Sequence, residues 1–348
     1  MTRFSLSTAA AAALLLGGSA SALAQSNVKL YGLIDLNVGQ FQSAGGSKTW
    51  QVSNGDFSTS FLGFSGREDL GGGLAASFAL ESFFRPDTGR SGRVAVDVSP
   101  RADVFWARAA NVTLSGDFGS VKIGRQTTAM FVSTLIFNPF GDSFGFSPSI
   151  RHYYTSALVG DSGWSNAMSY QTPNFGGLSA TLQASLGEGA AKSVGKNFGG
   201  NVLYFAGPFA ATASWQKVKS DYDLRFGTTL APGFVDQTAY QFGASYNFGP
   251  VKAFGQFGKV DTDAAADTTA KIYQVGASVP VGAGKFLASY GNLKYTGARV
   301  GSSKITTLGY DHDLSKRTDV YAVVMVDKEQ LANYESGSSV VLGLRHAF

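Results

Sequence analysis

Cysteine, charge and long apolar runs are all scarce in this 348-residue chain. It has no cysteine, which excludes a fold held by disulfides. Charged residues make up only 15% of the chain and the formal net charge is +4, too little to favour nucleic acid as a partner. After the first 24 residues, no apolar stretch approaches the roughly eighteen residues that a transmembrane helix requires.

The first residues form a predicted secretion signal. Arg3 gives a short positive start, residues 9–16 are apolar but too few to span a bilayer, and Ala22 to Ala24 is a small-x-small cleavage site. We therefore expect residues 1–24 to be a cleaved signal peptide and residues 25–348 to be the mature domain. Arg3 is the only charge in the leader, so its removal lowers the net charge from +4 to +3.

Alternation with a period of two residues dominates the mature chain. Near its start, Leu30 and Ile34 fall on one face while Tyr31 and Asp35 fall on the other. The clearest stretches of this kind are residues 28–38, 178–186 and 339–346. One apolar and one polar face is typical of a strand with lipid on one side and water on the other.

Short turns and longer polar loops follow one another in strict order. The turns, rich in Gly, Asp and Pro, lie at residues 68–73, 116–119, 173–177, 207–208, 248–250, 280–284 and 313–316. The loops lie near residues 42–56, 85–101, 127–164, 187–198, 220–237, 261–270, 296–303 and 328–337. The order predicts an all-β fold, a single sixteen-stranded antiparallel transmembrane β-barrel, closed so that no strand edge meets lipid.

Residues 126–164 do not alternate. This stretch is too long and too aromatic for an ordinary surface connection, and it contains the phenylalanines Phe131, Phe137, Phe140, Phe144 and Phe146. In a water-filled barrel such a loop can fold inward and bury its rings against the wall. We expect this third extracellular loop to fold inward and narrow a channel.

Several motifs, spread from the first strand to the last, resemble those of Gram-negative general porins of the β-proteobacterial (Burkholderia, Neisseria and Comamonas) type. They are Leu30-Tyr-Gly-Leu-Ile-Asp35, Leu62 to Gly73, Leu114 to Gln126, Tyr170 to Gly177, Leu314 to Tyr321 and Gly343-Leu-Arg-His-Ala-Phe348. The resemblance implies a homotrimer in the cell outer membrane. It also implies a constriction in which wall arginines face carboxylates of the third loop.

This resemblance predicts a porin for passive diffusion of ions and small hydrophilic solutes, with a modest anion preference and no cofactor. Its expected partners are its own copies, outer-membrane lipid and lipopolysaccharide, and the outer-membrane assembly machinery, with no nucleic acid. The alternative is a substrate-selective channel whose constriction is lined by Phe61 and loop phenylalanines. An outer-membrane enzyme is disfavoured because His152, His312 and His346 lie in no recognisable Ser or Asp motif.

The constriction candidates combine alternation with the resemblance. They are Arg108, Lys122, Arg67, Glu81, Phe61, Gln171, Phe140 and Asp142. Alternation puts Lys122 and Arg67 on wet faces, whereas only the resemblance puts Arg108 there. Phe61, Ser65 and Gln171 stand where the resemblance would place arginines, so the expected anion preference is modest.

Three further predictions concern contacts and metals. The resemblance makes Arg125 a candidate trimer contact, to a loop-two acid such as Asp87 or Asp97. Phe348, the aromatic end of the last strand, is the candidate assembly signal. Asp261, Asp263 and Asp267 lack the Gly turn and terminal Glu of a calcium loop, so no metal site is predicted.

Overall fold

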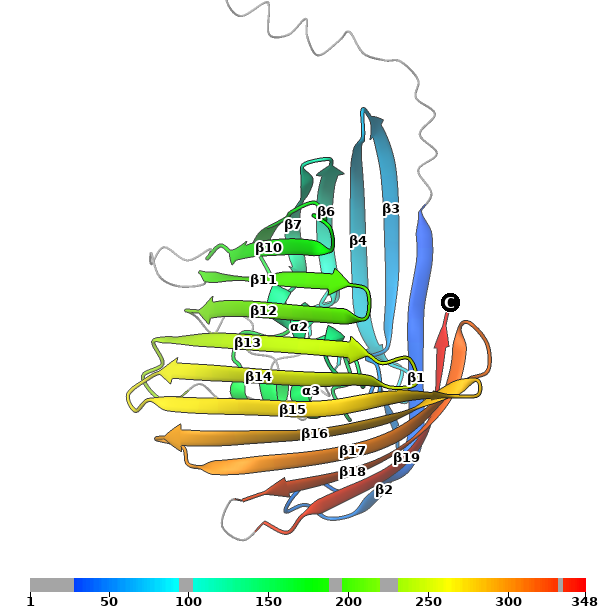
Figure 1. The fold of residues 1–348 in the computed structure, drawn as a ribbon, viewed down its shortest axis with the longest axis vertical. Helices are drawn as coiled ribbons and strands as arrows, with labels where there is room; N and C mark the ends of the chain where they lie inside the picture. Colours follow the sequence, from blue (N-terminus) through cyan, green and yellow to red (C-terminus); the bar gives the residue numbers. More distant parts are fainter. Residues whose placement is uncertain (1–27, 94–102, 188–195, 220–230, 331–333) are drawn as a thin grey trace, which may run out of the picture.

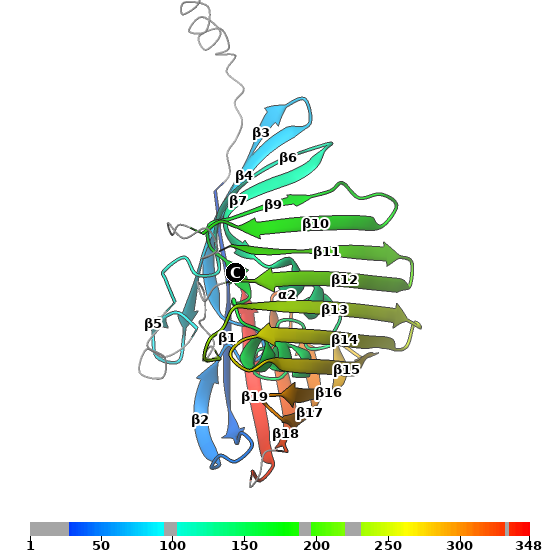
Figure 2. The ribbon, with the colours of Figure 1, turned by 90° about the vertical axis from the view of Figure 1, so that its left-hand side faces the viewer.

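The strands form one antiparallel sheet that closes on itself. The computed structural model describes residues 28–93, 103–187, 196–219, 231–330 and 334–348. Strand β1 (Lys29–Phe41) pairs along its length with the last strand, β19 (Gly337–Ala347), so the sheet has no free edge. Figures 1 and 2 show the resulting barrel from two sides. The predicted signal peptide lies outside the described residues.

Nineteen labelled strands make sixteen barrel strands, as predicted. Strands β2 (Thr49–Asn54) and β3 (Phe61–Gly71) both pair with β1 and form one interrupted strand. Strands β8 (Gly163–Trp164) and β9 (Ala167–Gln171) likewise both pair with β7 (Gly119–Thr127). The two-residue β5 (Arg90–Ser91) pairs with the end of β4 (Leu74–Arg85) and is not a barrel strand.

The remaining strands follow one another as hairpins around the barrel. They are β6 (Ala109–Gly116), β10 (Leu178–Ser185), β11 (Asn197–Ala206), β12 (Phe209–Val218), β13 (Asp236–Asn247), β14 (Lys252–Asp263), β15 (Thr268–Val281), β16 (Gly284–Gly297), β17 (Gly301–Asp313) and β18 (Thr318–Glu329). The predicted turns all lie at one end. Two predicted loops, 261–270 and 296–303, are wrong in length, because strand pairing leaves only 264–267 and 298–300 unpaired. The predicted loop 42–56 is wrong in part, because residues 49–54 form β2 and pair with β1.

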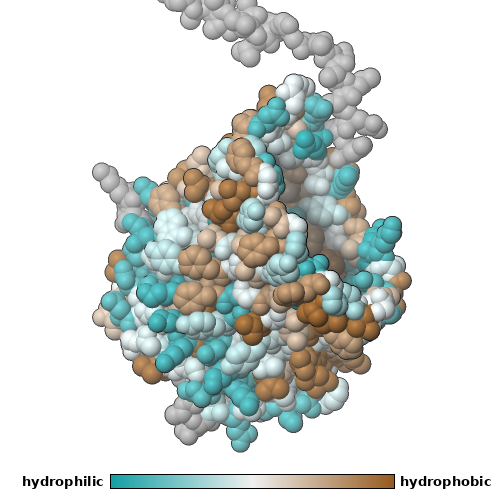
Figure 3. Space-filling view, viewed as in Figure 1, coloured by the Kyte–Doolittle hydropathy of each residue, from teal (hydrophilic) through white to brown (hydrophobic). Residues whose placement is uncertain are grey.

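Alternation separates an outer apolar face from an inner polar one. In β13, Tyr240 and Phe242 are 44% and 54% exposed, while Gln241 between them is fully buried. Figure 3 shows hydrophobic side chains spread over the strands, with hydrophilic ones denser on the left, where the long loops lie. An apolar outer band is what a bilayer requires of a barrel. None of the described helices is long and apolar enough to cross a membrane.

The third long loop lies inside the barrel. It contains the helices α2 (Ala129–Ile136) and α3 (Pro148–Ile150) and the π-helix η1 (Arg151–Ala157). Inward side chains hold its backbone: the Asn201 amide donates to the Ala129 carbonyl at 2.9 Å, and Thr307 Oγ1 donates to the Phe146 carbonyl at 2.8 Å. Figure 1 shows α2 and α3 behind the strands of one half of the wall.

Inward-facing glycines make room for the loop. A Cβ on Gly258 would lie 1.7 Å from Tyr153 Oη, and one on Gly243 would lie 3.0 Å from Phe137. No other residue allows so close an approach, since every other side chain begins with a Cβ. The loop therefore packs directly on the backbone of the wall at these positions.

Candidate channel constriction

A water-accessible cavity of about 600 Å³ lies between α2 and the part of the wall formed by β3 to β11. The predicted candidates that line it are Arg67, Glu81, Arg108, Lys122 and Gln171. The other lining side chains are mostly hydroxyls, amides and alanines from these strands. The structure thus brings five of the eight constriction candidates to one cavity.

Two side chains hold Arg108 directly, and a third supports one of them. Its Nη1 donates to Glu81 Oε2, and its guanidinium lies 3.9 Å from the centre of the Phe61 ring. The Tyr31 hydroxyl donates to the other oxygen of Glu81. A charge-assisted bond and a cation–π contact together fix the arginine, so Glu81 and Phe61 position the charge that faces the cavity.

Lys122 and Arg67 carry charge that is not paired. Among the described residues, no carboxylate lies within ion-pair distance of either side chain. Lys122 lies opposite Thr113 on β6 and Ser169 on β9, both uncharged. Unpaired cations in a narrow, partly dehydrated space attract anions.

Asp142 supplies a carboxylate from the loop. It lines a small side cavity of about 50 Å³ together with Arg108 and Phe144, and Ser58 Oγ donates to its Oδ1 at 3.1 Å. Burial raises the pKa of Asp142, and the nearby Arg108 only partly offsets this. The loop carboxylate and the wall arginine therefore share one site.

The prediction that Phe140 lines the constriction is wrong. This ring is only 1% exposed and packs 6.0 Å from Phe57, in a cluster with Tyr321 and Val323. Phe137 and Phe146 are equally buried. These rings bury apolar area against the wall and do not line an open path.

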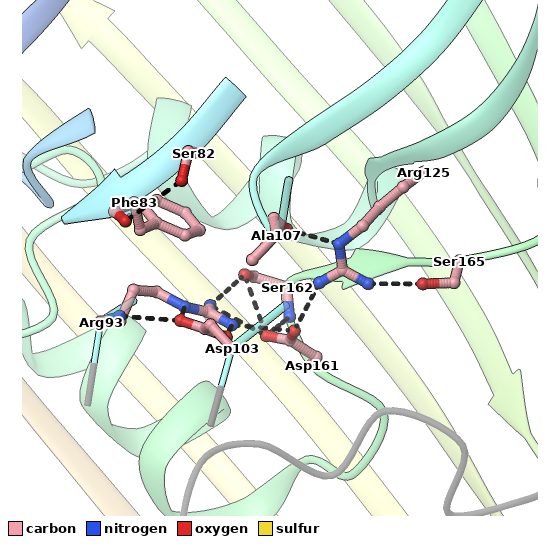
Figure 4. A network of polar contacts seen from close by, with 9 residues as sticks. All are labelled: Ser82, Phe83, Arg93, Asp103, Ala107, Arg125, Asp161, Ser162 and Ser165. Carbon is pink, nitrogen blue, oxygen red and sulfur yellow. Dashed lines mark hydrogen bonds and ion pairs between the residues drawn. The ribbon is translucent and has the colours of Figure 1, made fainter. Parts of the chain in front are cut away.

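Arg125 turns into its own chain and not toward the outer surface, contrary to the prediction. Its Nη2 donates to Asp161 Oδ2 at 3.1 Å and its Nη1 to Ser165 Oγ at 2.8 Å, because residues 161–165 return along β7 and cover it (Figure 4). Of the predicted partners, Asp87 accepts a hydrogen bond from Asn54, and Asp97 lies outside the described residues.

Asp161 binds a second arginine from loop two. Arg93 Nη2 lies 3.0 Å from the same carboxylate and 2.9 Å from Asp103 (Figure 4). Burial alone would raise the pKa of Asp161, but Arg93 and Arg125 hold it below its ordinary value. The network joins loop two to the end of the third loop, just before that loop re-enters the wall.

A second charged cluster, which the sequence did not single out, lies near the turn end. Arg345 on β19 donates to Asp319 at 2.8 Å and to Asp311 at 3.0 Å. Carboxylate oxygens of Asp311, Asp313 and Asp319 lie within 4.8 Å of one another. Alternation marks Arg345 as inward, but only the strand register, in which it faces Asp319, reveals the cluster.

Phe348 closes the barrel against the first strand. Its backbone exchanges two hydrogen bonds with Gly32, both 3.1 Å long. A Cβ on Gly32 would lie 2.6 Å from the Phe348 ring, so the terminal aromatic sits over this glycine. The last residue thus completes the pairing that seals the sheet.

Comparison with known proteins agrees with this architecture. The profile of the Gram-negative porin family matches residues 7–330. Outer membrane porin protein 32 of Delftia acidovorans is 33% identical, covering 96% of this chain and 97% of that protein. An outer membrane porin protein of Bordetella pertussis is 29% identical over 98% of this chain and 99% of that protein.

Solved porin structures share this fold. The anion-selective porin from Comamonas acidovorans superposes with a TM-score of 0.77 and 31% identity, covering 93% of this chain and all of that one. OmpF of Salmonella typhi, at 16% identity and a TM-score of 0.68, shares the fold. A closed sixteen-stranded barrel around a charged, water-accessible cavity defines a pore-forming protein of the outer membrane. The chain belongs to the Gram-negative porin family.

Proposed function

We propose that this porin is a passive diffusion channel for ions and small hydrophilic solutes, with a modest preference for anions. The observation that carries the preference is the charge of the constriction. Arg67, Arg108 and Lys122 stand against Glu81 and Asp142, which leaves one positive charge in excess. A low-dielectric opening magnifies such a small imbalance. The similar Comamonas acidovorans porin is described as anion-selective.

The preference is modest for two physical reasons. Glu81 forms an ion pair with Arg108 and so reduces the field of that arginine in the pore. Phe61 and Gln171 add no charge, although the family resemblance would place arginines there. Salt weakens the remaining field, because the screening length falls to about 3 Å at 1 M.

Zero-current potentials across a KCl gradient test this proposal. We expect an anion-selective wild type, a shift toward cations in Arg108→Glu, and stronger anion selectivity in Glu81→Gln. Arg317→Glu is the matched control, because that arginine lies in the turn that joins β17 and β18. A cation-selective wild type, or a potential unchanged in Arg108→Glu, would contradict the proposal.

The alternative, a substrate-selective channel with an aromatic constriction, has less support. It needs rings along the path, yet the loop rings Phe137, Phe140 and Phe146 are at most 1% exposed. Phe131 and Phe144 line the small side cavity and not the main one. Phe61 stacks beneath Arg108 and is not among the residues that line the main cavity. KCl conductance that saturates with concentration would favour this alternative.

An enzymatic role is also less well supported. His152 Nε2 lies 3.3 Å from Ser303 Oγ, but both residues are buried beneath the loop. Burial lowers the pKa of His152 to about 3, and no partner among the described residues contacts its Nδ1. A general base needs a pKa near the working pH and a group that orients it. Ester hydrolysis by the purified protein would reverse this view.

The assembly is proposed on the family resemblance. We expect a homotrimer in contact with outer-membrane lipid and lipopolysaccharide, and recognition of Phe348 by the assembly machinery. The native mass in mild detergent checks the trimer, and outer-membrane yield after deletion of Phe348 checks the signal. Residues 25–348 are proposed as one domain after removal of the leader.

A further inference from the structure

A second cavity opens at the end of the barrel that carries the long loops. Its volume is about 330 Å³, within the range typical of small-ligand sites. Four segments surround it: residues 156–159 of the third loop, 231–237, 262–268 and 295–299. Most of its lining is apolar, and includes Ala157, Val159, Pro232, Phe234 and Ala265.

Hydrogen bonds between the segments hold the cavity open. Val235 N donates to the Asp263 carbonyl at 2.8 Å, Ala265 N to the Pro232 carbonyl at 3.0 Å, and Ala298 N to the Asp267 carbonyl at 2.8 Å. Each bond ties one wall of the cavity to the next. A site already formed in this way loses little conformational entropy when it is occupied.

The floor of the cavity is fixed to the barrel wall. The Gln237 side chain accepts from Val159 N at 2.9 Å and donates to the Ala157 carbonyl at 3.0 Å. The Tyr295 hydroxyl donates to the Ser156 carbonyl at 2.7 Å. These polar groups are satisfied by the protein itself, so the surface left for a ligand is largely the apolar one.

Among the described residues that line the cavity, Arg299 is the one with a charged side chain. Its guanidinium lies 4.0 Å from the centre of the Tyr295 ring, and no carboxylate among the described residues pairs with it. Of the nearby acids, Asp261 pairs with Lys259, Asp267 accepts from the Ala264 backbone, and Glu329 lines a separate small cavity on the other side of Tyr295 and Arg299 without forming an ion pair with Arg299. An apolar cavity with one available cation suits an anion with an apolar body.

We propose that this cavity is a binding site for small aromatic carboxylates at the extracellular mouth of the channel. The carboxylate meets Arg299, and the ring lies against Val159 and Phe234. The site rests on the proposed diffusion function, because it would load one class of solute above the constriction. It differs from an aromatic constriction, since the residues of the main cavity take no part in it.

A comparison of benzoate with acetate separates the contribution of the aromatic ring to binding from that of the carboxylate charge. Channels are reconstituted in planar bilayers, and conductance is measured at rising concentrations of potassium benzoate or potassium acetate. We expect benzoate conductance to saturate and acetate conductance to stay linear. Arg299→Gln should raise the half-saturating benzoate concentration at least about tenfold, as expected for loss of one charge-assisted contact. Ala266→Phe, which fills the cavity, should make the benzoate response linear.

Arg317→Gln is the control, because it removes the same charge from the opposite end of the barrel. It should leave benzoate saturation unchanged. Benzoate conductance that rises linearly in a channel that conducts KCl and acetate would overturn the binding site and leave the diffusion channel intact. A half-saturating concentration that is equal in wild type and Arg299→Gln would also overturn it. A folded protein that conducts none of these salts would overturn both proposals.

Discussion

The two halves of the inner wall differ in the charge they carry. The half formed by β3 to β10 is open to the main cavity and carries Arg67, Glu81, Arg108 and Lys122. In the half that the third loop covers, most inward residues at the level of the loop are uncharged, and the buried Asp327 of β18 pairs with Arg151 of the loop at 3.3 Å. The uncharged residues include Thr212, Ser214, Gln241, Gln256, Gln274, Ser289 and Thr307, all at most 6% exposed.

The cost of burying charge explains this difference. An ion that found no partner beneath the loop would lose its water without compensation, whereas an amide or hydroxyl can bond to the loop. Gln256 donates to the Thr134 carbonyl at 2.9 Å, and Gln241 donates to Gln256 at 2.8 Å and to Thr134 Oγ1 at 3.1 Å. The loop thus stays where the wall is polar enough to hold its backbone and uncharged enough to be covered.

If the third loop is released, the half of the wall that it covers should also become open to water. We expect Asp161→Asn to have the largest effect of the variants that test this. The change leaves Arg93 and Arg125 buried without their shared carboxylate, which costs about 3–5 kcal/mol. We expect noisier open-channel current and a larger conductance. Asp87→Asn removes an exposed loop carboxylate and is the control. Quiet, wild-type current in Asp161→Asn would show that the network does not anchor the loop.

The same network gives a pH dependence with a definite sign. The pKa of Asp161 in the folded protein lies below its unfolded value, so its contribution to stability is complete above the unfolded pKa of about 3.9. That contribution falls as the pH drops through the lowered folded pKa. Current noise in the wild type should therefore rise only below about pH 4, whereas Asp161→Asn should be noisy at neutral pH as well.

A charge introduced into the wall beneath the third loop tests whether the loop excludes water there. Gln241→Glu puts a carboxylate at a fully buried position, and we expect a loss of about 2–4 kcal/mol at pH 7. Gln171→Glu makes the same change in the open wall and should leave stability nearly unchanged. The temperature at which the folded band converts to the unfolded band on a detergent gel measures both. Equal midpoints would mean that the loop does not exclude water from Gln241.

The sequence predicted the barrel well because its signals are local. Period-two alternation, turn chemistry and loop order each need only neighbouring residues, and they are enough to count sixteen strands and to find the inward faces. Alternation also placed Lys122 and Arg67 on the wet face, where both line the cavity. Two loops were predicted too long because polar residues such as Thr262 and Thr268 still pair as strand.

The site was predicted less well because it depends on contacts far apart in the chain. Phe140 is aromatic whether it faces the pore or the wall, and only the position of Val323 and Tyr321 behind it decides. Arg125 pairs with Asp161, which lies 36 residues further along the chain, near the end of the third loop. One sequence signal could have located the loop. Apolar residues at inward positions, such as Ile272 and Leu293, are unfavourable in a water-filled lumen and so indicate where the loop covers the wall.

The smallest expected effect concerns the wall glycines on which the third loop packs. Gly258 on β14 faces inward, and a Cβ there would lie 1.7 Å from Tyr153 Oη, closer than any real contact. In Gly258→Ala the Tyr153 ring must move, and because it is fully buried among other side chains the expected cost is about 1–3 kcal/mol. Gly255 is on the same strand, and an added Cβ there would have nothing within 4 Å. Gly255→Ala is therefore the control, because it changes backbone freedom without a clash. We expect a lower unfolding midpoint and altered conductance in Gly258→Ala only. Equal midpoints in the two variants would mean that the loop can shift by an ångström or more without loss, and that the uncharged wall and not the close fit determines its position.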